Sequence, residues 1–255
     1  MAATTARDAG ARAGRFYVSM AGACALIAFG SFAETYWLQL PAGTFVGAPI
    51  IHVHAVLFSG WTLLLLSQTV LVANGRLEHH RAWGLAGVAL ASAMVWVGLA
   101  TAVYGLKEGL ARGHGDGARA FLIVPVTAIG MFAAFFAAAI ANLARPEWHK
   151  RLIMVASVTI LQAAVARLIF VLKTGGGPGQ RPGLGSPTVA QALGPALLVE
   201  LLLFAGVAYD WRTRGRPHPA YLIGIAITAA VAVLRIPASE TTAWRSIAEF
   251  LGGFA

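Results

Sequence analysis

Long apolar runs, separated by short polar segments, recur along the whole chain. Six of them are near or above the roughly 20 residues that an α-helix needs to cross a bilayer, and a seventh is shorter. No run shows the short alternating pattern of a membrane β-barrel, so helical spans are predicted. The seven runs are Phe16 to Ala33, Pro49 to Ala73, Ala82 to Leu106, Phe121 to Leu143, Leu152 to Leu172, Val189 to Tyr209 and Tyr221 to Ile236.

Composition supports the same class. The 255 residues are 58% hydrophobic and 11% charged, which is far too apolar for a soluble domain of this length. We therefore predict an all-α protein, a seven-helix bundle in which residues 1–255 form a single integral membrane domain. The chain contains no phosphate-binding glycine loop, no nucleophile elbow and no CxxC motif, so an enzymatic activity is neither indicated nor excluded.

A short R-x-x-x-H element occurs three times at a constant interval of 69 residues. That interval matches one transmembrane hairpin with its loop, and it predicts an N-terminal helix followed by three related hairpins at approximately 49–106, 121–172 and 189–236. The alternative is that hairpins of equal length place basic loops at equal spacing by accident. The three copies are Arg76 to His80, Arg145 to His149 and Arg214 to His218.

The net charge of +9 is concentrated on one side of the predicted bundle. Basic residues in short loops mark the cytoplasmic side of a membrane protein, which predicts a cytoplasmic N-terminus, a periplasmic C-terminus and contact with lipid but not with nucleic acid. The basic residues on this side are Arg7, Arg12, Arg15, Arg76, Arg81, Arg145, Lys150, Arg151, Arg212, Arg214 and Arg216.

The two ends of the chain each allow two interpretations. Ser31-Phe32-Ala33 fits a signal-peptidase site, and cleavage there would leave six helices. The single Cys24 lies in this first run, where it is a small packing residue. The tail predicts a short interfacial helix over 239–251, with Trp244, Ile247, Ala248 and Leu251 on one face. A frayed tail is the alternative.

Ionisable side chains within apolar runs are the first candidates for function, because charge is costly in hydrocarbon. Counting residues along each predicted helix places His54, Arg167 and Arg235 in one layer near the outer surface, with Glu200 and Gln162 about two turns deeper. Glu200 is expected to pair with Gln162 or Arg167. Alternatively, both arginines extend to headgroups and Glu200 is a neutral acid bonded to a neighbouring helix.

Prolines occur at a similar depth on two other predicted helices. Pro125 and Pro195 occupy nearly equivalent positions in the repeat, and each is expected to kink its helix by removing a backbone hydrogen bond. Kinked outer halves together with the charged layer predict a polar cavity close to the outer surface. The alternative is that the prolines only shape packing.

Three histidines begin predicted helices on the basic side. His80, His149 and His218 are candidate ligands for a metal ion or haem, whose propionates would meet Arg81, Arg145 or Arg151. The alternative is an interfacial ring that contacts phosphate headgroups. His54 has no intramembrane histidine in its own layer, so an outer haem on His54 would be five-coordinate or need another kind of ligand.

Several motifs resemble those of an uncharacterised family of bacterial multi-pass inner-membrane proteins, and the likeness extends over roughly residues 34–221. They are Ile51-His52-Val53-His54-Ala55, Trp61, Gln68-Thr69, His80-Arg81-Ala82-Trp83-Gly84, His149-Lys150-Arg151-Leu152-Ile153-Met154, Arg167 and Gly215-Arg216-Pro217-His218-Pro219. The His-Arg and His-Lys-Arg-Leu motifs are also loosely similar to those of haem-copper oxidase assembly proteins and b-type cytochromes. The resemblance implies only that His54, His80, His149, Arg167 and His218 belong to the family's pattern.

Three classes of function remain open from the sequence. The first is a redox-linked role in which the histidines bind haem b, a quinone or a metal ion, and the protein carries electrons or assists a respiratory complex. The second is a proton-coupled transporter of a small anion, with Arg167, Arg235 and His54 as binding charges and Glu200 as the proton carrier. A purely structural subunit of a respiratory complex is a third alternative.

Overall fold

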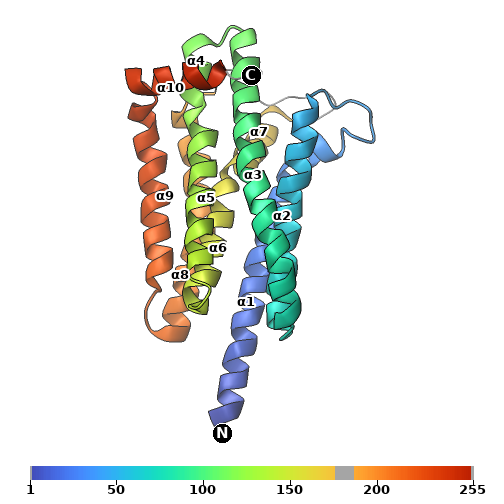
Figure 1. The fold of residues 1–255 in the computed structure, drawn as a ribbon, viewed down its shortest axis with the longest axis vertical. Coiled ribbons are helices and arrows are strands. Elements are labelled where there is room, and N and C mark those ends of the chain that lie inside the picture. The colour runs from blue at the N-terminus through green and yellow to red at the C-terminus, as the bar shows by residue number, and fades with distance from the viewer. Residues whose placement is uncertain (1, 176–186, 254–255) are drawn as a thin grey trace.

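The computed structural model describes residues 2–175 and 187–253 of the chain. It confirms the predicted all-α fold, because seven helical stretches are long and apolar enough to cross a membrane (Figure 1). The helices are α1 (Ala2–Ser31), α2 (Pro49–Ala73), α3 (Leu77–Ala111), α4 (Gly115–Phe121), α5 (Ile123–Ala141), α6 (Pro146–Ile160), α7 (Gln162–Thr174), α8 (Leu193–Arg214), α9 (Pro219–Ala238) and α10 (Thr242–Gly252), with short η1 (Ala33–Trp37) and η2 (Ala190–Ala192).

The turns that carry the three R-x-x-x-H elements lie together at one end of the bundle. In Figure 1 the α2–α3, α5–α6 and α8–α9 turns are all at the end where the chain begins, and α4, α10 and the C-terminus are at the opposite end. We call the first of these the basic end. The predicted arrangement of one N-terminal helix followed by three hairpins is therefore present in the structure.

Two of the membrane-spanning stretches are each divided into two helices. One breaks at Leu122, where the short α4 precedes α5 and the predicted fourth span, and the other breaks at Leu161 between α6 and α7, within the predicted fifth span. At the second break the Leu161 N–H bonds to the Val158 carbonyl, 3.0 Å away, which is a tighter turn than an α-helix makes. The break brings Gln162 into the bundle interior, where it is 6% exposed.

The two prolines do not kink helix interiors as the sequence suggested. Pro125 lies in the first turn of α5, and Pro195 lies in the first turn of α8 after the short η2. The first turn of a helix has no intrahelical acceptor for its N–H groups, so a proline there removes no hydrogen bond. Both prolines help to start a new helix at a break.

Small residues allow α9 to approach its neighbours closely. A Cβ atom added to Gly206 on α8 would lie 2.5 Å from the Tyr221 ring, and one added to Gly224 on α9 would lie 2.7 Å from Val155. Glycine at such contacts is typical of helix interfaces in membranes. Tyr221 is fully buried, so α9 is held tightly against α6 and α8 near the basic end.

The predicted tail helix is present as α10. Thr241 caps it by accepting a bond of 3.2 Å from the Trp244 N–H, and the Trp244 indole N–H donates to the Arg119 carbonyl at 2.9 Å. Ala248 is fully buried against the opposite end of the bundle. Ile247 was expected on the same face, but its side chain is 47% exposed, so the buried face is narrower than predicted.

Candidate functional site

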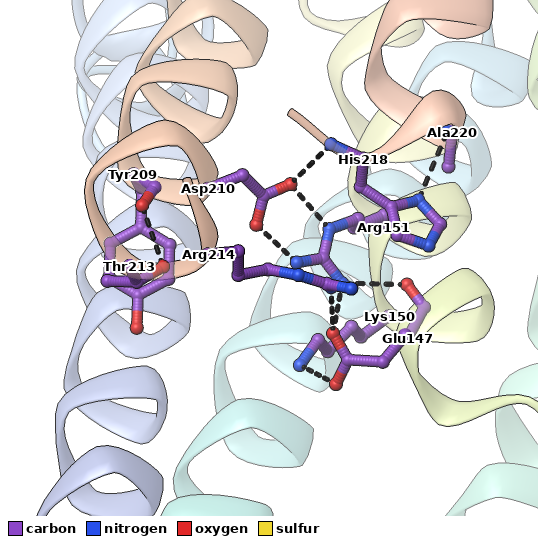
Figure 2. A network of polar contacts seen from close by, with 9 residues as sticks. All are labelled: Glu147, Lys150, Arg151, Tyr209, Asp210, Thr213, Arg214, His218 and Ala220. Carbon is purple, nitrogen blue, oxygen red and sulfur yellow. Dashed lines mark hydrogen bonds and ion pairs between the residues drawn. The ribbon is translucent and has the colours of Figure 1, made fainter. Parts of the chain in front are cut away.

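A buried ion pair forms the centre of the basic end. Arg151 on α6 and Asp210 on α8 are 1% and 0% exposed, and their planar groups meet in a two-pronged contact (Figure 2). The Arg151 Nε–H donates to Asp210 Oδ2 over 2.9 Å, and a terminal guanidinium N–H donates to Oδ1. Such paired bonds fix the relative orientation of both side chains.

Glu147 extends this pair to the surface. Its Oε2 accepts from Arg151 at 2.6 Å and from Arg214 at 2.7 Å, while Lys150 donates to Oε1 over 2.6 Å. Glu147 lies in the first turn of α6, where the helix dipole also favours a carboxylate. One acid therefore joins α6 to the end of α8 (Figure 2).

His218 belongs to this network and not to a cluster of histidines. Its backbone N–H donates to Asp210 Oδ2 over 3.1 Å, and its Nδ1 accepts from the Ala220 N–H over 3.1 Å, so the ring caps the start of α9. Its ring meets Trp148 edge to face at 4.9 Å. Burial, assisted by the Arg151 and Arg214 cations, lowers the pKa of His218 and keeps Nδ1 free to accept.

The rings of the other two histidines of the repeat lie edge to face. The rings of His80 on α3 and His149 on α6 lie with centres 6.5 Å apart and planes at 79°. The His149 Nδ1–H donates to the Ala139 carbonyl at 3.0 Å, which leaves its Nε2 with a free lone pair. The Nδ1 of His80 is buried and has no hydrogen-bond partner among the described residues.

These contacts reduce the number of histidines that could bind one metal ion together. Among the described residues, no group of three or more His, Cys, Asp and Glu side chains is placed to hold a metal ion. The three histidines therefore do not form one three-ligand centre, because His218 is used as a helix cap. His80 and His149 remain together, and the exposed Arg81 and Arg145 lie on the same two turns.

A second polar group lies deeper in the bundle, between α6, α7, α8 and α9. Glu200 is 4% exposed, and its Oε1 accepts from the Thr228 hydroxyl at 2.8 Å. Arg235, which is 2% exposed, donates to Gln162 Oε1 over 2.9 Å. Glu200, Gln162, Arg235 and Thr228 all line one cavity of about 20 Å³, which is room for a water molecule.

The outer layer predicted from residue counting is only partly assembled. Glu200 and Gln162 share a cavity as expected, but Arg167 forms no ion pair with Glu200 and instead lies over the Phe32 ring at 5.3 Å. Arg167 is on a face of α7 turned toward α1, whereas Glu200 faces α9. His54 stacks on Phe58 at 4.0 Å and does not line the cavity.

Sequence reasoning did not identify two residues that matter here. Asp210 was not singled out, because it lies at the end of an apolar run beside Arg212, where an acid is usually solvated. Thr228 was missed because a threonine in an apolar helix commonly bonds to its own backbone. Arg151 was noted as one of many loop cations and as a candidate partner of haem propionates, but not as half of a buried ion pair, although its side chain is only 1% exposed.

Together the fold and its buried polar groups define an all-α multi-pass membrane protein with two separate internal sites. Comparison with protein-family models, with curated proteins and with solved structures found no match. The candidate function is therefore argued from geometry alone.

Proposed function

We propose that this membrane protein has a redox-linked role and that its centre is bound between His80 and His149. The observation that carries the proposal is the edge-to-face pair of imidazoles. Ring centres that share one ion lie about 5 to 6.5 Å apart when each metal–nitrogen bond is about 2 Å long. The ring centres of His80 and His149 are 6.5 Å apart, which is at the upper end of this range.

The hydrogen bonding of the pair supports a ligand role. Metal-binding histidines usually donate their second ring N–H to a carbonyl or carboxylate, which fixes the tautomer and the ring orientation. His149 makes such a bond to Ala139. An unpartnered buried nitrogen, such as Nδ1 of His80, costs free energy unless a ligand occupies it.

Two imidazoles leave coordination positions open on most transition metals. The two imidazoles suit a metal ion or a haem iron that exchanges electrons. A quinone is an alternative occupant of the same site, because its oxygen can accept a hydrogen bond from an imidazole N–H. We place the site on the cytoplasmic side of a bacterial inner membrane, following the basic loops. From there the protein would pass electrons to, or assist the assembly of, a respiratory complex.

The test compares His80 and His149 with their exposed neighbour His79. Protein purified in a mild detergent is examined for visible absorption, for metal content by mass spectrometry and for extractable quinone. We expect one of these signals in the wild-type protein, and we expect its loss in His80→Ala and in His149→Ala. His79→Ala also replaces a histidine by alanine, next to His80. This variant should keep the signal, because the His79 side chain is exposed.

A gel-filtration profile shows whether each variant remains folded. The proposal is wrong if the wild-type protein carries neither metal, haem nor quinone, or if folded His149→Ala retains the bound group unchanged.

A further inference from the structure

Arg235 is a buried cation that makes no direct ion pair among the described residues. One of its terminal nitrogens donates to Gln162 Oε1 and the other to the Ala192 carbonyl, both over 2.9 Å. Both acceptors are neutral. No carboxylate of the described residues lies within the 4.0 Å of an ion pair with Arg235. A guanidinium that is 2% exposed and contacts only neutral acceptors is costly whenever Glu200 is protonated, so in that state the site favours a negative partner.

The structure also provides a place for such a partner. Arg235 lines the cavity of about 20 Å³, and its Nε–H is buried with no acceptor. The lining residues contribute one other ionisable side chain, Glu200, and the remainder are apolar or neutral. A cavity of this size admits a water molecule or a monatomic ion, and it is too small for a haem, a quinone or a multi-carbon carboxylate.

Thr228 allows Glu200 to exist in two protonation states. The Thr228 hydroxyl lies 2.8 Å from Glu200 Oε1 and 2.9 Å from the Gly224 carbonyl. A hydroxyl has one proton to donate. When Glu200 is ionised, Thr228 donates to it. When Glu200 is protonated, the acid donates to the Thr228 oxygen and Thr228 donates to Gly224, so the Thr228 hydroxyl and Glu200 Oε1 are paired in both states.

We propose that this cavity binds a small monovalent anion of halide size at Arg235, and that binding is accompanied by uptake of one proton on Glu200. When Glu200 is ionised, the charges of Glu200 and Arg235 sum to zero, so a neutral water molecule can occupy the cavity between them. With Glu200 protonated, Arg235 and the anion again sum to zero. Both states therefore avoid a net charge in a low-dielectric interior.

The cavity at Arg235 is separate from the histidine pair, so an experiment can disprove one proposal without affecting the other. His80 and His149 are at the basic end, whereas Arg235 is in the last turn of α9 near the opposite end (Figure 1). Proton-linked anion binding at Glu200 and Arg235 is the first requirement of the anion-transport function considered from the sequence.

The experiment measures the melting temperature of the purified protein as chloride replaces gluconate at constant ionic strength. Chloride should raise the melting temperature saturably, because a ligand that binds only the folded state stabilises it. Above the pKa of Glu200, the apparent Kd for chloride should rise about tenfold for each pH unit, since one proton is taken up with the anion.

Variants separate the two side chains. Glu200→Gln should bind chloride equally well at acidic and neutral pH, and Arg235→Gln should lose the response. The exposed Glu240→Gln is the matched control and should behave as the wild-type protein does. A wild-type protein indifferent to chloride at every pH would mean a water-bridged Glu200–Arg235 pair and would overturn the proposal, as would an unchanged response in Arg235→Gln.

If Arg235→Gln does not fold, chloride-35 NMR of the wild-type protein decides the question. Bound chloride broadens the resonance, and we expect bromide to reverse the broadening by competition. Absence of broadening at acidic pH, where binding should be tightest, would also overturn the proposal.

Discussion

Histidine serves two different purposes at the basic end, although the three copies occupy the same repeat position. His218 is a helix cap whose Nδ1 must remain unprotonated to accept from Ala220. His149 donates through the same atom, to Ala139, and thereby keeps its other nitrogen available. The identity of the hydrogen-bond partner thus determines which histidine is able to bind a ligand.

The capping role of His218 predicts a dependence of stability on pH. Burial lowers the folded-state pKa of His218 below its usual value of about 6.5, so its contribution is complete above that pH and is lost as the pH falls toward the folded-state pKa. His218→Asn keeps a capping acceptor without titrating, whereas His218→Ala should cost about 1 kcal/mol at neutral pH.

Melting temperatures of the purified proteins at neutral and mildly acidic pH provide the measurement. On acidification the wild-type protein should lose more stability than His218→Asn does. Equal losses would show that the protonation of His218 has no influence on folding.

At the scale of the element, apolar runs were sufficient to predict seven spans, because the cost of exposing backbone polar groups to lipid leaves helices as the only solution. The break at Leu161 was not predictable in this way, since it lies within continuous apolar sequence, whereas the break at Leu122 lies at the start of an apolar run, just after Asp116 and Arg119. Residue counting placed Glu200 and Gln162 at one depth correctly. It could not give the rotation of each helix, so Arg167 was assigned to the cavity together with Arg235, whereas only Arg235 lines it and the unpredicted Thr228 lines it too.

The pair of Arg151 and Asp210 connects α6, α8 and the start of α9, and its loss should loosen all three helices. Asp210→Asn leaves a fully buried guanidinium without its buried charge partner and with only the exposed Glu147, which should cost about 3 to 5 kcal/mol. Glu78→Gln is the control, since Glu78 is exposed at the repeat position of Glu147 but makes no ion pair among the described residues, and its effect should stay within about 0.5 kcal/mol.

Reversible unfolding in mixed detergent micelles gives the free energy of unfolding of Asp210→Asn and of Glu78→Gln. A double variant, Arg151→Met with Asp210→Leu, should be less destabilised than Asp210→Asn alone, because no unpaired charge remains. If Asp210→Asn lowers the free energy of unfolding no more than Glu78→Gln does, Glu147 alone is sufficient to neutralise Arg151.

For the molecule as a whole, the three basic turns and the N-terminus share one end, while α4 and α10 cover the other (Figure 1). The concentration of arginine at the first of these ends predicts that it faces the cytoplasm. Because Cys24 is the one cysteine of the chain and is 2% exposed, it can be replaced by alanine to give a background for site-specific labelling.

On that background, Glu240→Cys at the opposite end should react with a membrane-impermeant maleimide added to intact cells, and Arg145→Cys should not. Inside-out vesicles should reverse the pattern. Labelling of Arg145→Cys from outside intact cells would contradict the predicted orientation.

Glu147 has a consequence for how the three hairpins depend on one another. The third copy of the motif has Gly215-Arg216 where the second has Pro146-Glu147, so it lacks an acid of its own, and Arg214 bonds to Glu147 across the boundary between copies. Asp210 supplies the return contact, to Arg151 of the second copy. The second and third hairpins are thus complementary, and neither could be duplicated, exchanged or deleted without leaving an unpaired charge in the other.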